Sequence, residues 1–523
     1  MLLIMSGSYI PQELGAEFGK IPPSFLPLGN KRLFQHQVKL YSEPQPIYIT
    51  LPDDYPLCKN DETWLHNNNV NIIRIDSELT LGQALITAWN LIEDKTGKTL
   101  RLLFGDTLLD SLPLDYDLVA TSQSQDSYQW SQFNHYGILD NDERNLEDVI
   151  CGYFTFSNFN KFVKYLVLSK LDFINALENY RKHIGLTSFT VSGWLDFGHI
   201  NTYYQSKVKY TTQRSFNDLS ITLDHVKKSS SNHNKISAEA NWFKEIPDEI
   251  RLFTPQFLGS TSIPKATYKL EYLYNSALNE LFVFSQLPTT RLNSILMRCF
   301  DFIDLCSSHK AEVAQNSQTI RELFSVKTEQ RVQEYLSTNG FDIETQWSFN
   351  HKSTISIREM IDTANLYLPC ELPHQTIMHG DLCFSNILYD FRTNRIKTID
   401  PRGITQNGGI SIYGDYRYDL AKLSHSVLGL YDWIIAGYHH THIDKDRLII
   451  EQRFDIPSRI QEVQATFISM IEQRYNIPAL CLYAMQIHLF LSMLPLHTDD
   501  IQRQNGLFAN AFRIYEELKR LES

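Results

Sequence analysis

The chain has 523 residues, of which 43% are apolar and 21% charged, and its formal net charge is −12. This length predicts about two to four domains with ample hydrophobic core. The net negative charge makes nucleic acid an unexpected partner, because a nucleic-acid surface needs an excess of lysine and arginine. The seven cysteines are scattered and form no CxxC pair. That pattern argues against a zinc site or disulfide framework and favours a reducing, cytoplasmic location.

The first two hundred residues alternate between short apolar segments and segments with helical spacing. The opening, Met1–Met5, carries no basic residue, so it is typical of a buried strand rather than a signal peptide. We expect no membrane-spanning segment elsewhere in the chain. Strands are predicted at 2–5, 47–51, 70–75 and 102–104, and helices at 81–89 and 172–178. The alternation predicts an α/β sheet with ligands at the carboxyl ends of its strands.

Two aspartates in this region lie next to glycines near predicted strands. Asp106 follows the strand 101–105, and Asp196 lies within Trp194-Leu-Asp-Phe-Gly-His199. A carboxylate just beyond a buried strand suits a magnesium ion bound to nucleotide phosphates, and the glycine lets a ligand approach. Taken singly, each aspartate is more typical of a helix cap or a turn.

Taken in order, these elements resemble the sugar-phosphate nucleotidyltransferases. The resemblance rests on Ser6-Gly7-Ser8, Leu26-Pro-Leu-Gly-Asn-Lys-Arg-Leu33, Gly105-Asp106, and the Trp194 segment followed by Tyr203. It implies a GT-A/Rossmann-like nucleotidyltransferase domain at 1–206. The opening loop departs from the family, because it lacks Gly-x-Gly-x-Arg and offers only Gly7 and Gly15, with Lys20 as a stand-in for the arginine. The mid-domain glutamate-lysine-proline signature is also missing.

The same resemblance implies roles for individual residues. Lys31 would contact phosphate as a catalytic residue, and Asp106 and Asp196 would hold Mg²⁺. The nucleotide, with CTP or UTP as donor, would lie near Gly7, Gly82 and Gln83.

A second group of polar residues is concentrated in Thr376–Leu388. It contains His379-Gly-Asp381 and Asn386, and an Ile-Asp pair ending at Asp400 follows downstream. Phosphoryl transfer needs a carboxylate to accept the proton of the attacking hydroxyl, and an asparagine and a second carboxylate to hold magnesium. The spacing from Asp381 to Asn386 is that of a kinase catalytic loop. The alternative is a turn in which His-Gly-Asp caps a helix.

This part of the chain resembles the aminoglycoside phosphotransferase and choline kinase family, and Gly414-Asp-Tyr-Arg-Tyr-Asp-Leu-Ala421 adds to the match. The resemblance implies a two-lobed protein-kinase-like domain at 207–523, with its N-lobe at about 207–275 and its C-lobe at about 276–523. ATP would be the phosphate donor and Asp381 the base. The implied magnesium ligands are Asn386 and Asp400, and the residues that support the loop are His379 and Asp419. Proline and arginine after Asp400 argue against an activation segment switched by phosphorylation.

The expected N-lobe consists of a strand at 218–228, a polar turn, and a helix that begins at Lys235. The lysine for the ATP phosphates would be Lys228 or Lys227, and Val226-x-Lys228 has the spacing that favours Lys228. Glu239 on the helix would hold that lysine. The alternative is that both lysines lie in a solvated loop or linker.

The remaining kinase elements are a hinge and a helical lobe. The strand 268–273 would lead into the hinge, with Glu271 and Leu273 beside the adenine, while Arg214–Asn217 would form a phosphate loop without glycine. Beyond residue 420, helical spacing predicts an all-helical C-lobe. Aromatic and histidine residues that line either an acceptor pocket or helix interfaces are Tyr413, Tyr416, Tyr418, Trp433, His439 and His440.

The two resemblances on one chain imply consecutive steps. A kinase would phosphorylate a sugar, polyol or amino alcohol, and the other domain would make a nucleotide-activated precursor for surface polysaccharide or cell-wall metabolism. Two alternatives remain: a kinase with a non-catalytic nucleotide-binding domain, and a non-enzymatic sensor. The expected partners are the small acceptor and nucleoside triphosphates. The sequence leaves open which acceptor and nucleotide are used, and whether the chain forms oligomers.

Overall fold

The protein is described here by a computed structural model that covers residues 1–93, 99–123, 128, 130–134, 137–139, 148–210, 217–262, 265–312, 320–369, 374–405 and 408–522. The chain forms two compact units. Unit 1 consists of Met1–Thr211 with Phe284–Gln286, and unit 2 of Thr212–Val283 with Leu287–Ser523. The division therefore falls five residues beyond the expected boundary after residue 206.

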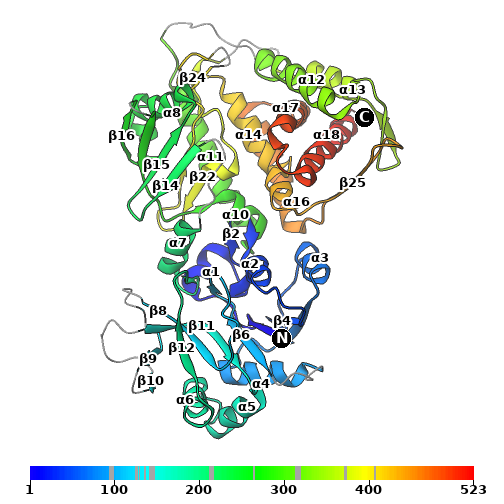
Figure 1. The fold of residues 1–523 in the computed structure, drawn as a ribbon. Helices are drawn as coiled ribbons and strands as arrows, with labels where there is room; N and C mark the ends of the chain where they lie inside the picture. Colours follow the sequence, from blue (N-terminus) through cyan, green and yellow to red (C-terminus); the bar gives the residue numbers. More distant parts are fainter. Residues whose placement is uncertain are drawn as a thin grey trace. The chain divides into compact units, whose positions relative to one another are not determined.

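The centre of unit 1 is a parallel sheet (Figure 1). Its strands lie in the order β6-β1-β4-β5. Their bounds are Leu100–Phe104 (β6), Leu2–Met5 (β1), Ile47–Pro52 (β4) and Val70–Ile75 (β5). Antiparallel β11 (Asp148–Phe156) extends the sheet beyond β6 and pairs with β8 (Leu118–Gln123) and β9 (Gln132–Asn134), which are followed outward by β12 (Thr187–Thr190) and β10 (Gly137–Leu139). The four predicted strands are present.

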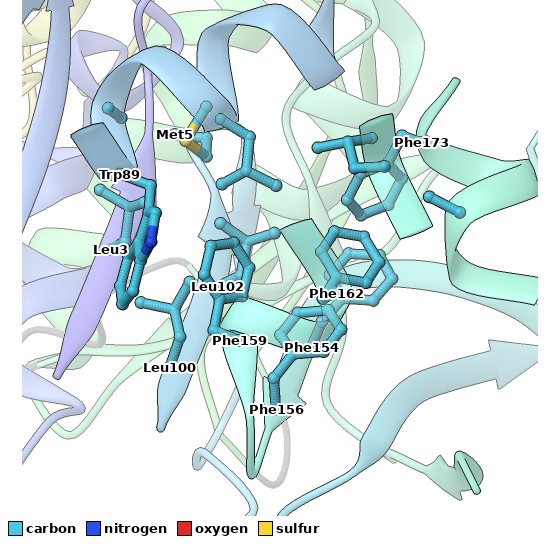
Figure 2. Close-up of a cluster of buried hydrophobic side chains, with 14 of the residues drawn as sticks. Leu3, Met5, Trp89, Leu100, Leu102, Phe154, Phe156, Phe159, Phe162 and Phe173 are labelled. Carbon is cyan, nitrogen blue, oxygen red and sulfur yellow. The ribbon is translucent and has the colours of Figure 1, made fainter. Parts of the chain in front are cut away.

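The helices of unit 1 are α1 (Gln12–Phe18), α2 (Leu33–Lys39), α3 (Lys59–Asn67), α4 (Leu81–Leu91), α5 (Phe159–Leu168), α6 (Phe173–Ile184) and α7 (Ile200–Lys209). One face of the sheet is covered by α4, α5 and α6 through an aromatic-rich core (Figure 2). In that core Trp89 lies edge-on to Phe159 with ring centroids 4.7 Å apart, and Phe156 packs on Phe162 at 4.4 Å. Short elements that bear on the site are β2 (Pro27–Leu28), β3 (Lys31–Arg32), β7 (Thr107–Leu108) and β13 (Leu195–Asp196).

Unit 2 begins with an antiparallel sheet in the order β14-β15-β17-β16 (Figure 1). The bounds are Asn217–Ile221 (β14), His225–Ser230 (β15), Thr267–Glu271 (β17) and Phe257–Thr261 (β16), with helices α8 (His233–Glu245) and α9 (Asp248–Arg251). The prediction of one strand over 218–228 was wrong, because Thr222 closes a tight turn inside it. Its hydroxyl oxygen accepts the backbone N–H groups of Asp224 and His225 at 3.3 and 3.1 Å, which makes the segment a hairpin.

The second lobe of unit 2 is mainly helical. Tyr272–Asn275 lead from β17 to β18 (Ser276–Ala277), which pairs with β22 (Ile387–Asp390) and through it with β23 (Arg395–Thr398). The helices are α10 (Leu278–Phe284), α11 (Thr289–Ser308), the π-helical Glu322–Val326, α12 (Lys327–Asn339), α13 (Ile357–Tyr367), α14 (Tyr416–Val427), α15 (Tyr431–Ile435), α16 (Ser458–Tyr475), α17 (Ala479–Met493) and α18 (Ile501–Glu522). The expected α/β fold class, a Rossmann-like unit plus a two-lobed unit, is confirmed.

The prediction of an all-helical C-lobe was wrong. Four strands pair in the order β20-β19-β26-β25, with bounds Ser353–Ile355, Trp347–Phe349, Ile449–Arg453 and His440–Asp444. The turn between β25 and β26 is fixed by Asp444, whose Oδ1 accepts the N–H groups of Asp446 and Arg447 at 3.1 and 3.0 Å. The Asp444 side chain closes the turn and so permits a hairpin. The helical spacing of apolar residues in the sequence did not predict it.

Among the residues that the structure describes, one segment, Ala479–His497, is long and apolar enough to span a membrane by length and composition, which corrects the expectation that no stretch of the chain has that character. In the structure 72% of this stretch is buried. It comprises α17 and the 3₁₀ turn Leu494–His497, and α17 packs against α12, α13, α14 and α18. It therefore serves as a core helix of unit 2.

A glycine pair tests how tightly unit 1 is packed. A Cβ on Gly82 would overlap the backbone carbonyl of Leu171, whereas a Cβ on Gly15 in α1 would meet nothing within 4 Å. We expect Gly82→Ala to lower the free energy of unfolding by about 1–3 kcal/mol, the usual cost of overpacking. Gly15→Ala should raise it by about 0.5–1 kcal/mol, because both residues are helical and alanine is the better helix former. Chemical denaturation measures both, and equal effects would contradict the packing argument.

Candidate active sites

The loop of unit 2 that holds His379, Asp381 and Asn386 is anchored from α14. The carboxylate of Asp419 accepts the N–H groups of His379 at 2.8 Å and Gly380 at 2.7 Å. Burial raises the pKa of Asp419 to about 7, against the lowering by these two donors. His379 is fully buried, and its Nε2 lies 3.0 Å from the carbonyl oxygen of Ile399. These contacts fit the supporting roles predicted for His379 and Asp419.

Asp381 lies in this loop with both carboxylate oxygens in contact with neighbours. Asn386 Nδ2 donates to the carbonyl oxygen and to Oδ2 of Asp381 at 2.9 and 3.1 Å. Lys422 Nζ lies 2.8 Å from Asp381 Oδ1, while 41% of the Asp381 side chain stays exposed. The carboxylate is therefore held in place yet open to a substrate. Sequence reasoning missed Lys422, because a lysine three residues after an aspartate on a helix is common and does not by itself indicate a contact with Asp381.

Of the two candidate lysines, Lys228 takes part in an ion-pair network. Lys228 Nζ lies 2.8 Å from Glu239 Oε2 on α8 and 3.0 Å from Asp400 Oδ1, and Tyr268 donates its hydroxyl to Glu239 at 2.9 Å. Burial alone would lower the pKa of Lys228, but the charges of Asp400 and Glu239 raise it, so the ammonium stays charged. The structure brings together Lys228, which was predicted to meet the ATP phosphates, Glu239, which was predicted to hold that lysine, and Asp400, which was predicted to hold Mg²⁺.

Lys227 is placed differently. Neighbouring residues of a strand point to opposite faces of the sheet, and Lys227 is exposed while Lys228 is buried. Lys227 lines a hollow of about 870 Å³ together with Lys265 and Lys269. Of the two lysines, only Lys228 meets the carboxylates of the predicted site in the part of the chain that the structure describes.

Asp400 adopts a backbone conformation that few residues other than glycine tolerate, with φ of 56°. Around it, Ile399 N–H donates to the carbonyl oxygen of Asn386 at 3.0 Å, and Arg402 N–H donates to that of His379 at 2.8 Å. A Cβ on Gly403 would overlap the carbonyl oxygen of Ala238 in α8. The segment after Asp400 is thus locked between the catalytic loop and the helix that carries Glu239.

The expected adenine contacts lie at the link between the lobes. Glu271 ends β17, and its Oε2 accepts the N–H of Gln256 at 3.2 Å, while Leu273 follows in the link and is half-buried. Of the expected phosphate loop Arg214–Asn217, residues 214–216 lie outside the described residues. Tyr418 and Trp433, considered as pocket residues, are buried within the helical lobe.

In unit 1, Asp106 and Asp196 meet through strand pairing. The strands β7 and β13 place Asp196 opposite Thr107, and Phe197 N–H donates to the carbonyl oxygen of Asp106 at 2.8 Å. A Cβ on Gly198 would lie 2.7 Å from Asp106 Oδ2 and 3.3 Å from Asp196 Oδ1, so both carboxylates face this glycine. Burial, followed by the charge of Asp196, raises the pKa of Asp106 to about 7.

His199 is a member of this site that sequence reasoning did not assign. Its Nδ1 lies 3.3 Å from Asp196 Oδ2, and this contact raises the pKa of His199. Its ring stacks on Tyr128 with centroids 4.0 Å apart. The quoted Trp194–His199 motif contained the residue, but its spacing gave no reason to separate it from a turn histidine.

The turn before Asp106 is held by polar contacts to backbone. Gln37 Nε2 donates to the carbonyl oxygens of Phe104 and Gly105 at 3.1 Å and of Thr107 at 2.8 Å. A Cβ on Gly105 would lie 2.8 Å from the carbonyl oxygen of Met5 at the end of β1. The carboxyl ends of β1 and β6 are thereby kept in close register beside the carboxylates.

The other predicted nucleotide contacts of unit 1 have structural explanations of their own. Gly7 is buried, and a Cβ there would overlap the side chain of Ile75. Gln83 forms a capping box with Thr80 at the start of α4, and Gly82 packs against Leu171. Lys31 is exposed on β3. Their contact with a nucleotide stays a prediction.

Within the described residues, no group of three or more His, Cys, Asp or Glu side chains could hold a metal ion by itself. Magnesium is usually bound by one or two carboxylates together with substrate phosphates. The facing pair Asp106 and Asp196 fits that pattern in unit 1, as do Asn386 and Asp400 in unit 2. Both donor sets therefore suit an ion that arrives with its nucleotide.

No family model matches the chain, and no curated protein matches it. Solved structures of two kinds are similar to it. The inositol-1-phosphate CTP transferase from T. maritima covers 40% of this chain with 95% of its own length, at 11% identity and a TM-score of 0.31. The Plasmodium vivax ethanolamine kinase covers 61% of this chain with 89% of its own, at 11% and 0.31. A macrolide 2'-phosphotransferase from Brachybacterium faecium covers 57% with 93% of its own, at 13% and 0.31.

The facing carboxylates of unit 1 predict a pH-dependent strain. Because the pKa of Asp106 is raised from 3.8 to about 7, the folded state holds this proton more tightly than the unfolded state does. The resulting destabilisation is absent below about pH 4, grows as the pH rises, and is complete above about pH 7. Without Mg²⁺, Asp106→Asn should therefore raise the Tm at about pH 8, with a difference that shrinks toward pH 4.

Added Mg²⁺ should raise the Tm of the wild type at about pH 8 more than that of Asp106→Asn, because the ion offsets carboxylate repulsion. Asp115→Asn, at an exposed carboxylate, serves as the control and should change neither value. An Asp106→Asn protein with a lower Tm than wild type at this pH would show that Asp106 is stabilised by its contacts and not destabilised by the charge of Asp196.

Proposed function

We propose that the chain is a bifunctional enzyme that phosphorylates a small hydroxyl compound with ATP and then joins the product to a nucleotide. The observation that carries the proposal is the assembled network in unit 2, in which Lys228 pairs with Glu239 and Asp400. A facing carboxylate pair in unit 1 supports the second activity. The product would be a nucleotide-activated precursor, made in the cytoplasm for surface polysaccharide or cell-wall metabolism.

In the kinase step, the charged Lys228 meets the phosphates of ATP and Glu239 fixes its position. Asn386 and Asp400 would hold Mg²⁺, which supplies charge neutralisation for the phosphates. Asp381 accepts the proton of the acceptor hydroxyl while that oxygen bonds to the γ-phosphorus. The bond from the γ-phosphorus to the β-phosphate oxygen breaks, and ADP leaves. Lys422, whose Nζ lies 2.8 Å from Oδ1 of Asp381, orients the carboxylate.

In the nucleotidyl step, a phosphate oxygen of the kinase product attacks the α-phosphorus of CTP or UTP. The bond from the α-phosphorus to the bridging oxygen breaks, and pyrophosphate leaves. Asp106 and Asp196 would hold Mg²⁺ against the triphosphate, and Lys31 would contact phosphate. The chemistry is mainly positioning and charge neutralisation, which a fixed pair of carboxylates can provide.

A kinase with a non-catalytic N-terminal domain is the second candidate. It is favoured by Gly82 and Gln83, which are engaged in packing and helix capping. The loop after β1 also lacks the Gly-x-Gly-x-Arg pattern.

The kinase assignment is tested at Asp381. Asp381→Asn keeps the shape of the side chain but removes the base, so phosphorylation should fall by roughly 10²–10⁴-fold, typical of positioned acid–base groups. ADP release with a panel of sugars, polyols and amino alcohols measures it. Asp362→Asn, at an exposed aspartate of α13, is the control and should retain full activity. Near-normal turnover by a folded Asp381→Asn protein would remove Asp381 from the mechanism.

Asp400→Asn should behave differently from Asp381→Asn. Because it removes a ligand charge, it should raise the Mg²⁺ concentration needed for half-maximal rate as well as lower the rate. Titrating Mg²⁺ at saturating ATP measures this. An unchanged Mg²⁺ requirement would assign Asp400 to holding Lys228 and not to the metal.

The two activities are separated by variants in each unit. Asp106→Ala and Asp196→Ala should each abolish pyrophosphate release and leave phosphorylation unchanged, because the loss of a ligand charge costs transition-state stabilisation of about 2.7–4 kcal/mol or more. Asp381→Asn should do the reverse when phosphorylated acceptor is supplied directly. Failure of the wild type to release pyrophosphate with any nucleoside triphosphate would favour the non-catalytic domain. Loss of both activities in folded Asp106→Ala protein would contradict independent sites.

A further inference from the structure

Four cationic side chains gather around one buried tyrosine in unit 2. We call them the cationic cluster; they are Lys327, Arg331, Arg402 and Lys422. The tyrosine is Tyr418, which is 2% exposed and lies one turn before Lys422 on α14. The guanidinium carbon of Arg402 lies 5.8 Å from the Tyr418 ring centroid. Lys327 and Arg331 come from α12 (Figure 1) and interact electrostatically with Tyr418. The start of α12 is brought to the tyrosine by Phe324, whose ring centroid lies 5.3 Å from that of Tyr418.

The cluster contains more positive charge than the carboxylates near it can balance. Lys422 is paired with Asp381 at 2.8 Å. Among the described residues, Lys327, Arg331 and Arg402 form no ion pair, and Arg331 Nη1 donates to the carbonyl oxygen of Ser492 at 2.9 Å. The exposed Glu334 on α12 acts on Arg331 only at a distance. Lys327, Arg331 and Arg402 therefore lie in the same region without a carboxylate partner of their own among the described residues.

The excess positive charge shifts the pKa of Tyr418 and of Lys327. Burial would raise the pKa of Tyr418, but Lys327, Lys422 and Arg402 bring it down to about 8. Tyr418 raises the pKa of Lys327, but burial and the neighbouring cations leave it below its ordinary value. Partly buried like charges are costly unless an opposite charge joins them. A site with such an excess is suited to an anion.

The position of the cluster indicates which anion. On the proposed function, the ATP phosphates belong to Lys228 and Asp400, on the strand β15 and the segment after β23. The cluster instead adjoins Asp381, the base that meets the acceptor hydroxyl, and half of it comes from α12, which supplies no other residue to the site. We propose that the acceptor is an anionic hydroxyl compound whose carboxylate or phosphate group is bound by the cationic cluster.

This inference rests on the proposed kinase function and narrows its substrate class. A quaternary amine or a polyamine sugar would be repelled by the same cations, so amino alcohols and aminoglycosides are disfavoured. The transfer is the one given above: the acceptor oxygen bonds to the γ-phosphorus, its proton goes to Asp381, and ADP leaves. The acid group of the acceptor stays unreacted and serves only for binding.

The test compares acceptors that differ in one charged group. The acids are glycerate, glucuronate and glycerol 3-phosphate, with glycerol and glucose as neutral partners, and choline and ethanolamine as cations. We expect at least one acid to exceed its neutral partner at least about tenfold in kcat/KM, and the two kinds of acid distinguish a carboxylate from a phosphate. Calorimetric binding with ADP and Mg²⁺ present provides a readout that does not need turnover.

Variants on α12 assign the binding to the cluster. Lys327→Met and Arg331→Met should each raise the KM or Kd of the acid about ten- to hundredfold, and leave the KM of ATP and the affinity of neutral partners unchanged. Lys327→Arg should restore binding, because it keeps the charge. Lys352→Met, at an exposed lysine of the same lobe, is the matched control and should have no effect. Thermal unfolding checks that each variant is folded.

The outcomes separate this inference from the kinase proposal. If an acid binds through Lys327 but no phosphate is transferred from ATP, the anion site stands and the kinase function fails. If a neutral or cationic acceptor is phosphorylated best and Lys327→Met does not change its KM, the kinase stands and the anion site is wrong. If no acid binds more tightly than its neutral partner, the inference is overturned. A raised KM for ATP in the α12 variants would assign the cluster to the nucleotide.

Discussion

The structure of unit 2 depends on a single buried ammonium group. Lys228 joins a strand, a helix and the segment after β23, because its two carboxylate partners, Glu239 and Asp400, come from different parts of the chain. Removing one member of a buried ion pair commonly costs about 3–5 kcal/mol, since the remaining charge is left without compensation. None of the three elements can therefore shift without exposing the others to that cost. The ion pairs of Lys228 form only when the strand, the helix and the segment after β23 have packed, and the same ion pairs then stabilise that packing.

The candidate site of unit 1 is based on repulsion between like charges, whereas that of unit 2 is based on attraction. Asp106 and Asp196 repel each other, and the neighbouring scaffold holds them in place with donors to backbone and side chain. Gln37 fixes the turn at Asp106, and the hydroxyl of Thr202 and the ring of His199 contact Asp196. Attraction builds the first site and constrained repulsion the second. Both leave negative charge where a cation carried by a nucleotide can settle.

The sequence allowed the four strands β6, β1, β4 and β5 of the central parallel sheet of unit 1 and the His379–Asn386 loop of unit 2 to be predicted, because both are local patterns. Val70–Ile75 is a run with β-branched residues, and Asp381 to Asn386 is a fixed spacing within one loop. Lys228 was favoured over Lys227 by the local spacing Val226-x-Lys228, and strand alternation in the structure puts Lys228 on the buried face. The hairpin at Thr222 and the strands β25 and β26 escaped prediction, because each depends on one side chain closing a short turn.

Lys422 and the cations of α12 escaped for another reason. They meet Asp381 and Tyr418 only after helices distant in sequence have packed, and a helical lysine three residues from an aspartate is ordinary in sequence. His199 was visible in its motif but had no partner until strand pairing brought Asp196 and Asp106 together. Charge balance over a folded region is a property of packing. Spacing along the chain does not carry it.

Gly403 has a consequence for the mobility of α8. Its missing side chain lets the backbone of the segment after Asp400 rest on the carbonyl of Ala238, one residue before Glu239 on α8. Protein kinases are commonly switched by swinging the corresponding helix away from its lysine. Here the segment that carries Asp400 packs directly against α8, so the helix and the segment would have to move together. On the proposed kinase function, a movement of α8 would therefore also displace Asp400, which disfavours control by that helix alone.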